Sequence, residues 1–330
     1  MRPLQVIVPI AGLGTRLRPH THIRPKPLLT VAGKTILDHI MDQLRGLPVT
    51  EIVFITGHLG DQVKQWAVDN CPFPARFVEQ TELRGQAHAI LLTREILQHP
   101  TLIIFGDTIF VADLSGLGDN GEQGRIYVQE VSDPARFGIA VVRDNEVVRL
   151  VEKPSEFVGN LAVVGIYYVQ DSRALLTAID QVIARDIQLG GEFYLADALQ
   201  IMIESGTTFR AAPVSVWADC GTVDAILDTN ALLLARGHAS ETSATTRSTI
   251  IQPVHIDPTA IIEDSIVGPN VSIEANVMIR HSTVTDSIVN SGAVLENATV
   301  SHSLIGRRAQ VRGEIGQFNL SDDSTVTKLT

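Results

Sequence analysis

The last third of the chain carries an apolar repeat with a period of six residues. Apolar side chains recur six positions apart in three runs, at Ile261, Val267, Ile273 and Ile279, at Ile288, Val294 and Val300, and at Ile305 and Val311. Related phrases return with the period, as SIVG at Ser265, SIVN at Ser287 and SLIG at Ser303. A helix repeats every 3.6 residues or so and a half-buried strand about every two, so a period of six fits neither.

This period is similar to the hexapeptide repeat of left-handed parallel β-helices, in which three short strands close one triangular coil. About 70 residues of such sequence predict about four coils, with loops where the register breaks. A small irregular sandwich is the alternative. The ends of a β-helix expose strand backbone and apolar side chains, so we expect a homo-oligomer through this region or through the N-terminal domain.

The rest of the chain alternates apolar runs of strand length with amphipathic segments. The runs QVIVPI, EIVFIT, ARFVE and TLIIFGD are separated by predicted helices near residues 35–45, 61–68 and 86–97. This alternation predicts a Rossmann-like α/β sheet that binds ligands at the carboxyl ends of its strands. Closely spaced strands over residues 125–169 predict added antiparallel pairing, hence a mixed sheet. Helices near 172–184, 195–204 and 223–236 follow, with a strand pair near 209–217.

Three parts follow from these patterns. We predict an α/β domain over residues 1–236, a linker over 237–249, and a β-helix over 250–330. The linker sequence GHASETSATTRS is small and polar, without a hydrophobic period. No apolar window is long enough to predict a membrane span, and the two cysteines have neither metal-ligand nor disulfide spacing. We therefore expect a cytoplasmic protein with no membrane partner.

Positive charge gathers near the N-terminus of an acidic chain. The net charge is −11, yet residues 1–34 contain six Arg or Lys and no Asp or Glu. A local cationic site of this kind favours a small anionic ligand over nucleic acid. The loop AGLGTRLRPHTHIRPKPLL, residues 11–29, is not a dinucleotide fingerprint because Leu17 replaces the third glycine. GKT at 33–35 is not a P-loop because Leu28 replaces the first glycine.

The loop resembles the signature GxGTRLxPxTxxxPKPLL of the sugar nucleotidyltransferases. Further motifs match that family in order: EQ at 79–80, GDT at 106–108, RFG at 136–138, VEKP at 151–154, GGEFYLADAL from 190 and WADCGT from 217. The resemblance covers residues 3–236, and long family members also carry a hexapeptide tail. A purely structural alternative, a glycine turn with surface cations, does not account for this series of motifs.

The resemblance implies a Mg²⁺-dependent transfer in which a sugar 1-phosphate attacks the α-phosphorus of a nucleoside triphosphate and pyrophosphate leaves. It implies catalytic roles for Arg16 and Lys26, on the leaving phosphates, and for Lys153, on the sugar phosphate. Asp107 and Asp219, each after an apolar strand, are the implied metal ligands. The implied nucleotide-binding residues are Ala11, Gly12, Gly14, Thr15, Gln80 and Gly85. The implied sugar-phosphate residues are Gly138, Glu152, Lys153 and Glu192.

Several assignments keep an alternative. The amide of Gln80 can face the imide edge of uracil or thymine, which favours UTP or dTTP. Gln86 replaces a residue that is small in the family, so a guanylyltransferase-like specificity for mannose 1-phosphate stays open beside the favoured glucose 1-phosphate. Glu192 could instead be the first-turn carboxylate of the next helix. Arg18, His20, His22 and Arg24 either touch phosphate or form a solvated rim.

Neighbouring Glu152 and Lys153 would point to opposite faces of a strand, so both can reach one ligand only where the strand ends or bulges. Pro154 favours such an end.

Two other functional classes remain. A non-catalytic relative could bind a nucleotide sugar and regulate a partner, but this chain keeps Arg16, Lys26, Asp107, Lys153 and Asp219. A bifunctional uridylyl- and acetyltransferase could use His281 or His302 in the tail. A structural or oligomer-forming tail is favoured, because we find no second glycine-rich or basic element for coenzyme phosphates.

Overall fold

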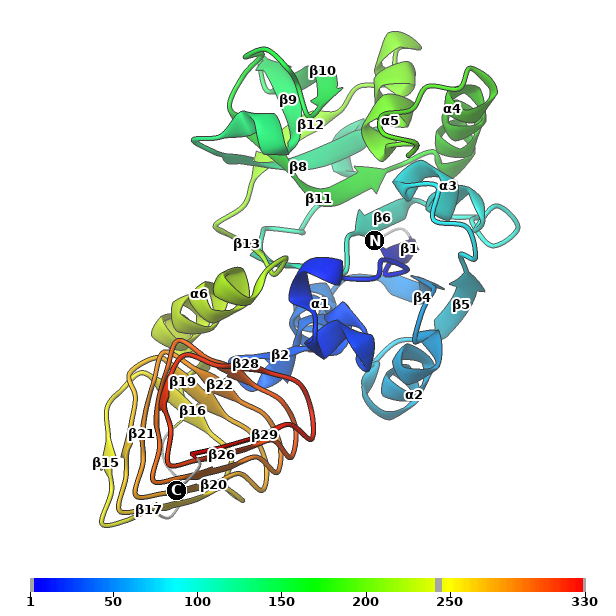
Figure 1. The fold of residues 1–330 in the computed structure, drawn as a ribbon. Helices are drawn as coiled ribbons and strands as arrows, with labels where there is room; N and C mark the ends of the chain where they lie inside the picture. The colour runs from blue at the N-terminus through cyan, green and yellow to red at the C-terminus, as the bar shows by residue number, and fades with distance from the viewer. Residues whose placement is uncertain (1–2, 241–244, 329–330) are drawn as a thin grey trace. The chain divides into compact units, whose positions relative to one another are not determined.

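The computed structural model describes residues 3–240 and 245–328. The chain forms two compact units. Unit 1 contains Met1–Leu13 and Leu37–Trp217, and unit 2 contains Gly14–Ile36 and Ala218–Thr330 (Figure 1). The cationic loop therefore belongs to the same unit as the C-terminal part of the chain. The predicted boundaries at 236 and 249 divide the chain by sequence position and do not describe this arrangement. Residues 241–244 of the predicted linker lie outside the described residues, as do 329–330.

Unit 1 is built on a nine-stranded mixed sheet with the order β5-β4-β1-β6-β11-β8-β12-β10-β9. Its strands are β1 (Leu4–Pro9), β4 (Val49–Thr56), β5 (Ala75–Glu79), β6 (Thr101–Ile104), β8 (Gly124–Glu130), β9 (Gly138–Arg143), β10 (Glu146–Glu152), β11 (Leu161–Val169) and β12 (Arg210–Pro213). The first four are parallel to one another, and β11 is antiparallel to β6 and β8. The predicted mixed sheet is confirmed.

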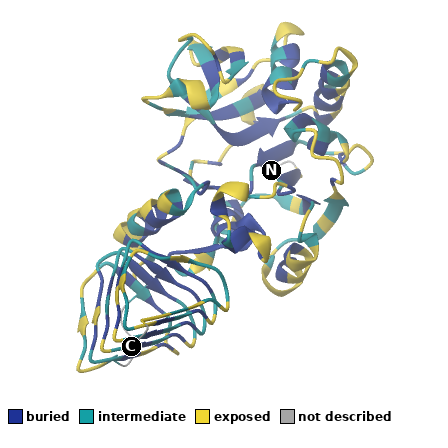
Figure 2. Cartoon of the chain, viewed as in Figure 1, coloured by how far each residue is buried: buried dark blue, intermediate teal, exposed yellow. Residues whose placement is uncertain are grey.

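Helices pack on this sheet because apolar side chains line one face of each. They are α1 (Ile36–Leu44), α2 (Gly60–Asn70), α3 (Gln86–Leu91), α4 (Ser172–Ala184) and α5 (Leu195–Glu204). Figure 2 shows the central strands and the inner helix faces as buried, and Ile7 and Ile103 are fully so. The predicted helix 86–97 is wrong after Leu91. There the buried hydroxyl of Thr93 donates to the carbonyl of Ile90, and turns replace the helix.

The segment before Asp219 forms two strands in different sheets. β12 pairs with β8 in the large sheet, whereas β13 (Val216–Asp219) pairs with β7 (Thr108–Val111). The strand pair expected at 209–217 is therefore wrong, since the two strands do not pair with each other.

The tail forms three all-parallel sheets, consistent with the predicted left-handed β-helix (Figure 1). One sheet holds β14 (Thr245–Thr246), β17 (Ile261–Glu263), β20 (Met278–Arg280), β23 (Val294–Glu296), β26 (Gln310–Arg312) and β29 (Thr325–Thr327). The second holds β15 (Thr249–Ile250), β18 (Ile266–Val267), β21 (Thr283–Thr285), β24 (Thr299–Ser301) and β27 (Ile315–Gly316). The third holds β16 (Val254–Ile256), β19 (Val271–Ile273), β22 (Ile288–Val289), β25 (Leu304–Ile305) and β28 (Asn319–Leu320).

The coils are shorter and more numerous than the sequence predicts. Paired positions in the first sheet, Thr245, Ile262, Ile279, Leu295, Val311 and Val326, are 17, 17, 16, 16 and 15 residues apart. These steps make five coils instead of about four. Each coil is shorter than three full hexapeptides. A strict period of six in the sequence therefore does not stay aligned with the inward-facing positions of successive coils. Ile261 is exposed and Val294 half-buried as a result, while their neighbours Ile262 and Leu295 fill the interior.

Serines of the recurring phrases form ladders along the inner corners of the coils. Ser265 accepts the backbone N–H of Ser282 at 3.1 Å and donates to the carbonyl of Glu263 at 2.6 Å. Ser287 likewise accepts from Ser303 at 3.1 Å, and Ser303 from Phe318 at 2.7 Å. Each buried hydroxyl thus satisfies a turn backbone N–H that no strand can pair.

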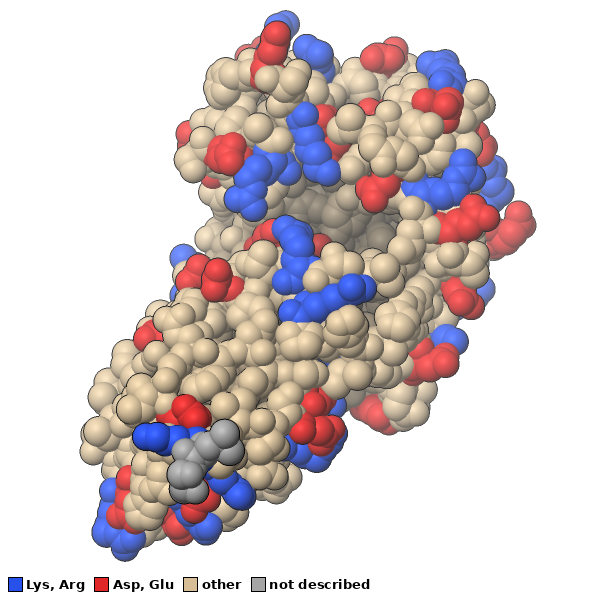
Figure 3. Space-filling view, viewed as in Figure 1, with Lys and Arg blue, Asp and Glu red and all other residues tan. Residues whose placement is uncertain are grey.

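The outer corners carry paired charges. Arg247 binds Asp264 at 2.6 Å and Arg308 binds Asp323 at 2.6 Å, in each case between neighbouring coils. Figure 3 shows blue and red side chains intermixed at the lower left, where the β-helix lies. A mixed surface of this kind does not attract a polyanion.

Two further elements link the loop to the β-helix within unit 2. A short hairpin, β2 (Thr30–Val31) with β3 (Lys34–Thr35), follows the cationic loop, and α6 (Val223–Leu233) runs into a π-helical turn, η6 (Leu234–His238). Gly33 lies in the hairpin with φ +80°, and a Cβ there would overlap the ring of His255 on β16. The hairpin therefore packs directly on the first coil.

Candidate active site

The cationic loop is a chain of three short 3₁₀ turns, η1 (Thr15–Leu17), η2 (His20–His22) and η3 (Lys26–Leu28). The hydroxyl of Thr21 donates to the carbonyl of Gly14 at 2.8 Å, which folds the loop back on itself. A Cβ on Gly14 would lie 3.4 Å from that of Lys26, so the start and the end of the loop are neighbours. Thr15 and Arg16 are exposed on the first turn, whereas Lys26 is buried.

Unit 2 brings Arg16, Lys26 and Asp219 together. The Nζ of Lys26 lies 3.9 Å from Oδ1 of Asp219, the last residue of β13. A Cβ on Gly221 would be 2.8 Å from Nη2 of Arg16 and 2.9 Å from Oδ1 of Asp219. Two cations around one carboxylate leave an excess of positive charge, which suits a polyphosphate.

In unit 1, Asp107 follows β6 at the carboxyl edge of the sheet, as predicted. The side chain is half-buried, and Oδ1 lies 3.4 Å from the hydroxyl of Thr108. Ala11, just after β1, is buried and Gly12 is exposed, so the chain leaves the sheet at Gly12.

Gln80 and Gly85 flank the same edge of unit 1. Gln80 is buried directly after β5, and its Nε2 donates to the carbonyl of Gly85 at 3.2 Å and lies 3.4 Å from Nδ1 of His88. Burial and the nearby Arg84 lower the pKa of His88, so a neutral ring can accept at Nδ1. Gly85 has φ +95°, and a Cβ there would clash with the backbone of Phe193.

Lys153 leaves the strand alternation because β10 ends at Glu152. Lys153 adopts φ 42°, and its N–H donates to the carbonyl of Phe137 at 3.0 Å. The expected strand end is confirmed. The ammonium donates to the hydroxyl of Tyr194 at 3.0 Å and lies 4.9 Å from the centre of that ring. This hydrogen bond is the main cause of a raised pKa at Lys153, so the side chain is charged at neutral pH.

Glu152 lies beside Gly138 on the neighbouring strand, since a Cβ on Gly138 would be 2.8 Å from its Oε2. Burial is the main cause of a raised pKa at Glu152; Asp197 and Glu192 raise it further, while Lys153 lowers it. Gly138, Glu152 and Lys153 thus form one cluster.

Glu192 is exposed and pairs with Leu189 in an isolated bridge before α5. The alternative that Glu192 is the first-turn carboxylate of that helix is wrong. The helix begins at Leu195 after Tyr194, and Asp197 is its first-turn acid.

Tyr194 is the residue that the sequence reasoning missed. It lies in the motif GGEFYLADAL, two positions after Glu192, and its contact with Lys153 depends on tertiary structure that the motif does not contain.

The four uncertain residues of the loop divide into two pairs. Arg18 and His22 are exposed, as a solvated rim requires. His20 and Arg24 are buried, with 4% and 5% of their surface accessible, so neither belongs to that rim. Their partners lie in the β-helix and are described below.

His20 gives the protein a pH-dependent stability. Burial lowers its pKa below the ordinary 6.5, and the hydrogen bond to Asn319 and the charge of Asp322 offset this only in part. The unfolded chain therefore takes up this proton at a higher pH than the folded chain. Stability from neutral His20 is fully present above the unfolded pKa of about 6.5 and is lost as the pH falls through it towards the folded pKa.

We therefore expect thermal unfolding midpoints of the wild type to fall between pH 7.5 and pH 5.5 by more than those of His20→Gln, whose amide can still donate to Asn319. Equal pH slopes in differential scanning calorimetry would contradict this assignment.

The tail histidines occupy corner turns. His281 and His302 have φ of 47° and 43°. Nε2 of His302 lies 3.0 Å from Oδ1 of Asp224, and Nδ1 of His281 lies 3.9 Å from Oδ2 of Asp264. Each ring thus lies beside a carboxylate.

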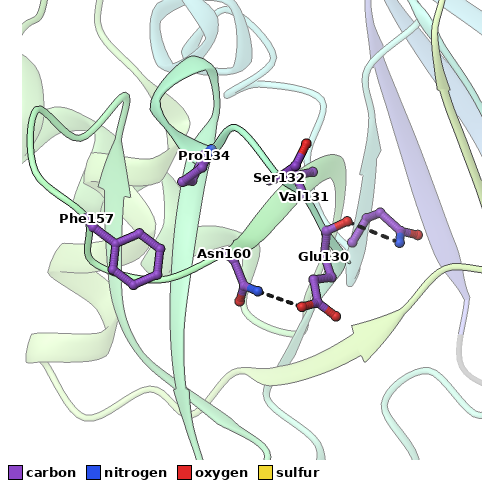
Figure 4. A pocket seen from close by; sticks show the side chains of 7 residues that line it. Glu130, Val131, Ser132, Pro134, Phe157 and Asn160 are labelled. Carbon is purple, nitrogen blue, oxygen red and sulfur yellow. Dashed lines mark hydrogen bonds between the residues drawn. The ribbon is translucent and has the colours of Figure 1, made fainter.

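A separate hollow of about 610 Å³ opens on unit 1 (Figure 4). It is lined by Gln129, Glu130, Val131, Ser132, Pro134, Phe157 and Asn160, and the Nδ2 of Asn160 donates to Glu130 Oε1 at 2.6 Å. The predicted site residues, all of which are described, do not line it.

An α/β sheet that leads into a glycine-started cationic loop, with carboxylates after its strands, is the architecture of a phosphate-binding α/β enzyme. The comparisons make the class specific. The chain belongs to the nucleotidyl transferase family, whose model matches residues 5–236, and is a nucleotidyltransferase.

Relatives and solved structures agree with this membership. A glucose-1-phosphate thymidylyltransferase of Streptomyces antibioticus is 28% identical, over 98% of this chain and 99% of its own. A low-salt glycan biosynthesis nucleotidyltransferase of Haloferax volcanii is 31% identical, over 91% of each chain. The structure of a UDP-glucose pyrophosphorylase complexed with UDP-glucose matches with a TM-score of 0.61 at 18% identity, over 70% of this chain and 98% of that one, which shows the shared fold.

No helix among residues 3–240 and 245–328 combines the length and the apolar character that a membrane span requires.

Proposed function

We propose that the protein transfers a nucleotidyl group from a nucleoside triphosphate to a sugar 1-phosphate, releasing pyrophosphate, with dTTP or UTP and glucose 1-phosphate as the favoured substrates. The observation that carries the proposal is the grouping of Arg16, Lys26 and Asp219 around the family signature. The names of the relatives, a thymidylyltransferase and a glycan biosynthesis nucleotidyltransferase, support it.

The chemistry explains why cations dominate the site. A phosphate monoester has a second pKa of about 6, so it reaches neutral pH as a nucleophile and needs no protein base. The difficulty is to bring two polyanions together. A pair of like unit charges about 4 Å apart costs about 4 kcal/mol at an effective dielectric of about 20. Arg16 and Lys26 would offset that repulsion on the β and γ phosphates, which become the leaving group.

On the other substrate, Lys153 would bind the sugar phosphate. The hydroxyl of Tyr194 holds its ammonium, so little side-chain entropy is lost when the phosphate binds. Glu152 and Glu192 would accept hydrogen bonds from sugar hydroxyls, with Gly138 leaving space for the ring. Burial raises the pKa of Glu152, and in either protonation state the carboxyl group keeps an oxygen that can accept a hydrogen bond.

Asp107 and Asp219 would hold Mg²⁺. Among the described residues no group of three or more His, Cys, Asp or Glu could hold a metal ion. The donor set of two strand-end carboxylates nevertheless fits Mg²⁺, which keeps several waters and takes one or two carboxylates together with substrate phosphates. When bound there, Mg²⁺ would neutralise charge on the phosphates.

The nucleobase would be read by Gln80. The NH₂ group of its amide has partners inside the protein, the carbonyl of Gly85 and the ring of His88, so the oxygen Oε1, an acceptor, is the atom that would face the base. An acceptor suits the imide N–H of thymine or uracil. Guanine also carries an N–H of this kind, so specificity for GTP and mannose 1-phosphate is the alternative.

The tail would act as a structural or oligomer-forming element. His281 and His302 lie in corner turns, and the sequence has no second glycine-rich or basic element for coenzyme phosphates, which favours a structural role over acetyl transfer. We propose a homo-oligomer through the β-helix or the α/β domain.

The proposed function is tested by a matrix of dTTP, UTP, GTP and ATP against glucose, mannose and glucosamine 1-phosphates, with pyrophosphate release as the readout. We expect turnover with dTTP or UTP and glucose 1-phosphate, lost when EDTA removes Mg²⁺. Turnover only with GTP and mannose 1-phosphate would favour the guanylyltransferase alternative. No turnover in any combination would favour the regulatory relative. Acetyl transfer from acetyl-CoA to glucosamine 1-phosphate would show the bifunctional enzyme.

A further inference from the structure

Two buried side chains of the cationic loop bind the last coil of the β-helix. Nε2 of His20 lies 2.7 Å from Oδ1 of Asn319, the first residue of β28. Nη2 of Arg24 binds Oδ2 of Asp322 at 2.9 Å, with 6% and 11% of the two side chains exposed. Neutral His20 must donate in this bond, because the amide oxygen can only accept.

The partners on the β-helix are themselves held in place. The second oxygen of Asp322 accepts the backbone N–H of Arg307 at 2.8 Å, which orients the carboxylate towards Arg24. Arg307 and Glu274 are the other charged residues near Arg24, and the charge of Arg307 helps burial to lower the pKa of Arg24. Asp322 is the carboxylate that pairs with Arg24, and Glu274 adds a further favourable charge. Loss of the paired carboxylate should be costly, because a buried guanidinium needs a counterion.

The end of the loop is held by earlier coils. Ala32, in the hairpin turn, donates its N–H to Oδ1 of Asn230 at 2.9 Å, and the same oxygen accepts from Ser272 on β19 at 2.6 Å. Gly33 packs on His255 of β16. The segment 14–36 thus contacts the first and last coils of the β-helix directly and is linked to the second coil through Asn230 of α6.

The phosphate cations lie inside this anchored segment. Lys26 follows Arg24 by two residues, and Arg16 precedes His20 by four. A shift of His20 or Arg24 would move a neighbouring cation. The loop contains only the three-residue 3₁₀ turns η1, η2 and η3, and no α-helix that would hold the cations in place independently.

We propose that the last coil of the β-helix sets the geometry of the triphosphate-binding loop, with His20 and Arg24 as positioning residues and Asn319 and Asp322 as their fixed partners. The inference rests on the proposed function for its phosphate-binding part. It makes the β-helix part of substrate binding, in addition to any role in assembly.

The test is Asp322→Asn in the full-length protein, with Asp323→Asn as the matched control. The two aspartates are adjacent, and Asp323 pairs with exposed Arg308 at 2.6 Å instead of with the loop. We expect amide hydrogen exchange over residues 14–30 to be faster in Asp322→Asn than in Asp323→Asn. If Asp322→Asn leaves the loop in its binding conformation about a tenth of the time, KM for the nucleoside triphosphate should rise about tenfold, while kcat at saturation should change little. A fall in kcat would instead indicate the loss of a phosphate contact, and would contradict a positioning role.

Asn319→Ala provides a second variant. It removes the bond to His20 and the bond of 3.5 Å from Nδ2 of Asn319 to the carbonyl of Arg18, but leaves the ion pair of Arg24 with Asp322, so it should show the same pattern more weakly. Equal loop exchange and equal KM in Asp322→Asn and Asp323→Asn would overturn the proposal. If the wild type releases no pyrophosphate, the proposed function fails, but the exchange comparison still decides whether the last coil anchors the loop.

Discussion

Replacing Lys153 by Ala is expected to lower kcat for pyrophosphate release by about 10²–10³-fold at saturating substrates, or about 3–4 kcal/mol of transition-state stabilisation. The ammonium is the cation that the site presents beside the Glu152 and Gly138 cluster, and Tyr194 holds it in place. Under the proposed function, the sugar phosphate would then approach the triphosphate with its charge uncompensated on that side.

The control for Lys153→Ala is Arg149→Ala. Arg149 is an exposed cation on the same strand, β10, so the substitution makes the same change in net charge away from the predicted site. Pyrophosphate release should be unchanged in Arg149→Ala. A Lys153→Ala enzyme with wild-type kcat would remove Lys153 from the site, whereas equal losses in both variants would point to a general electrostatic effect.

Local sequence was sufficient to predict the position of Asp107 at the carboxyl edge of the sheet and the end of strand β10. β6 covers the first four residues of the apolar run TLIIFG, and Asp107 directly follows the run, so it lies beyond the carboxyl end of the strand. In the same way Pro154 predicts a strand end at Glu152, which the left-handed turn at Lys153 confirms. Both inferences depend only on residues within a few positions of the feature.

The roles of His20 and Arg24 could not be predicted in this way, because their partners lie 299 and 298 residues further along the chain. A histidine and an arginine in a cationic loop look like phosphate ligands or a solvated rim until tertiary structure supplies Asn319 and Asp322. The coil lengths were missed for a related reason. Corner residues such as Asp264 and His281 adopt left-handed backbone conformations, and an apolar period carries no signal for the length of such corners.

Replacing Asn230 by Ala is expected to destabilise unit 2 by about 3 kcal/mol or more. Asn230 is fully buried on α6, and its amide makes three hydrogen bonds to two different segments, the hairpin and the second coil. Oδ1 accepts from the N–H of Ala32 at 2.9 Å and the hydroxyl of Ser272 at 2.6 Å, and Nδ2 donates to the carbonyl of Asn270 at 3.0 Å. Each buried partner left unsatisfied costs about 1–3 kcal/mol.

The matched control is Asp228→Ala, two positions earlier on the exposed face of the same helix, which tests helix propensity alone. Thermal unfolding and hydrogen exchange over residues 30–35 and 270–273 are the measurements. Because Asn230 joins the hairpin to the second coil, exchange should rise in both segments together in Asn230→Ala and in neither in Asp228→Ala. If only the coil loosened, the hairpin would be held by the packing of Gly33 on His255 alone. If the two variants unfolded alike, the buried amide would contribute nothing to the junction, and the loop would have to be anchored from its other end, at Asn319 and Asp322.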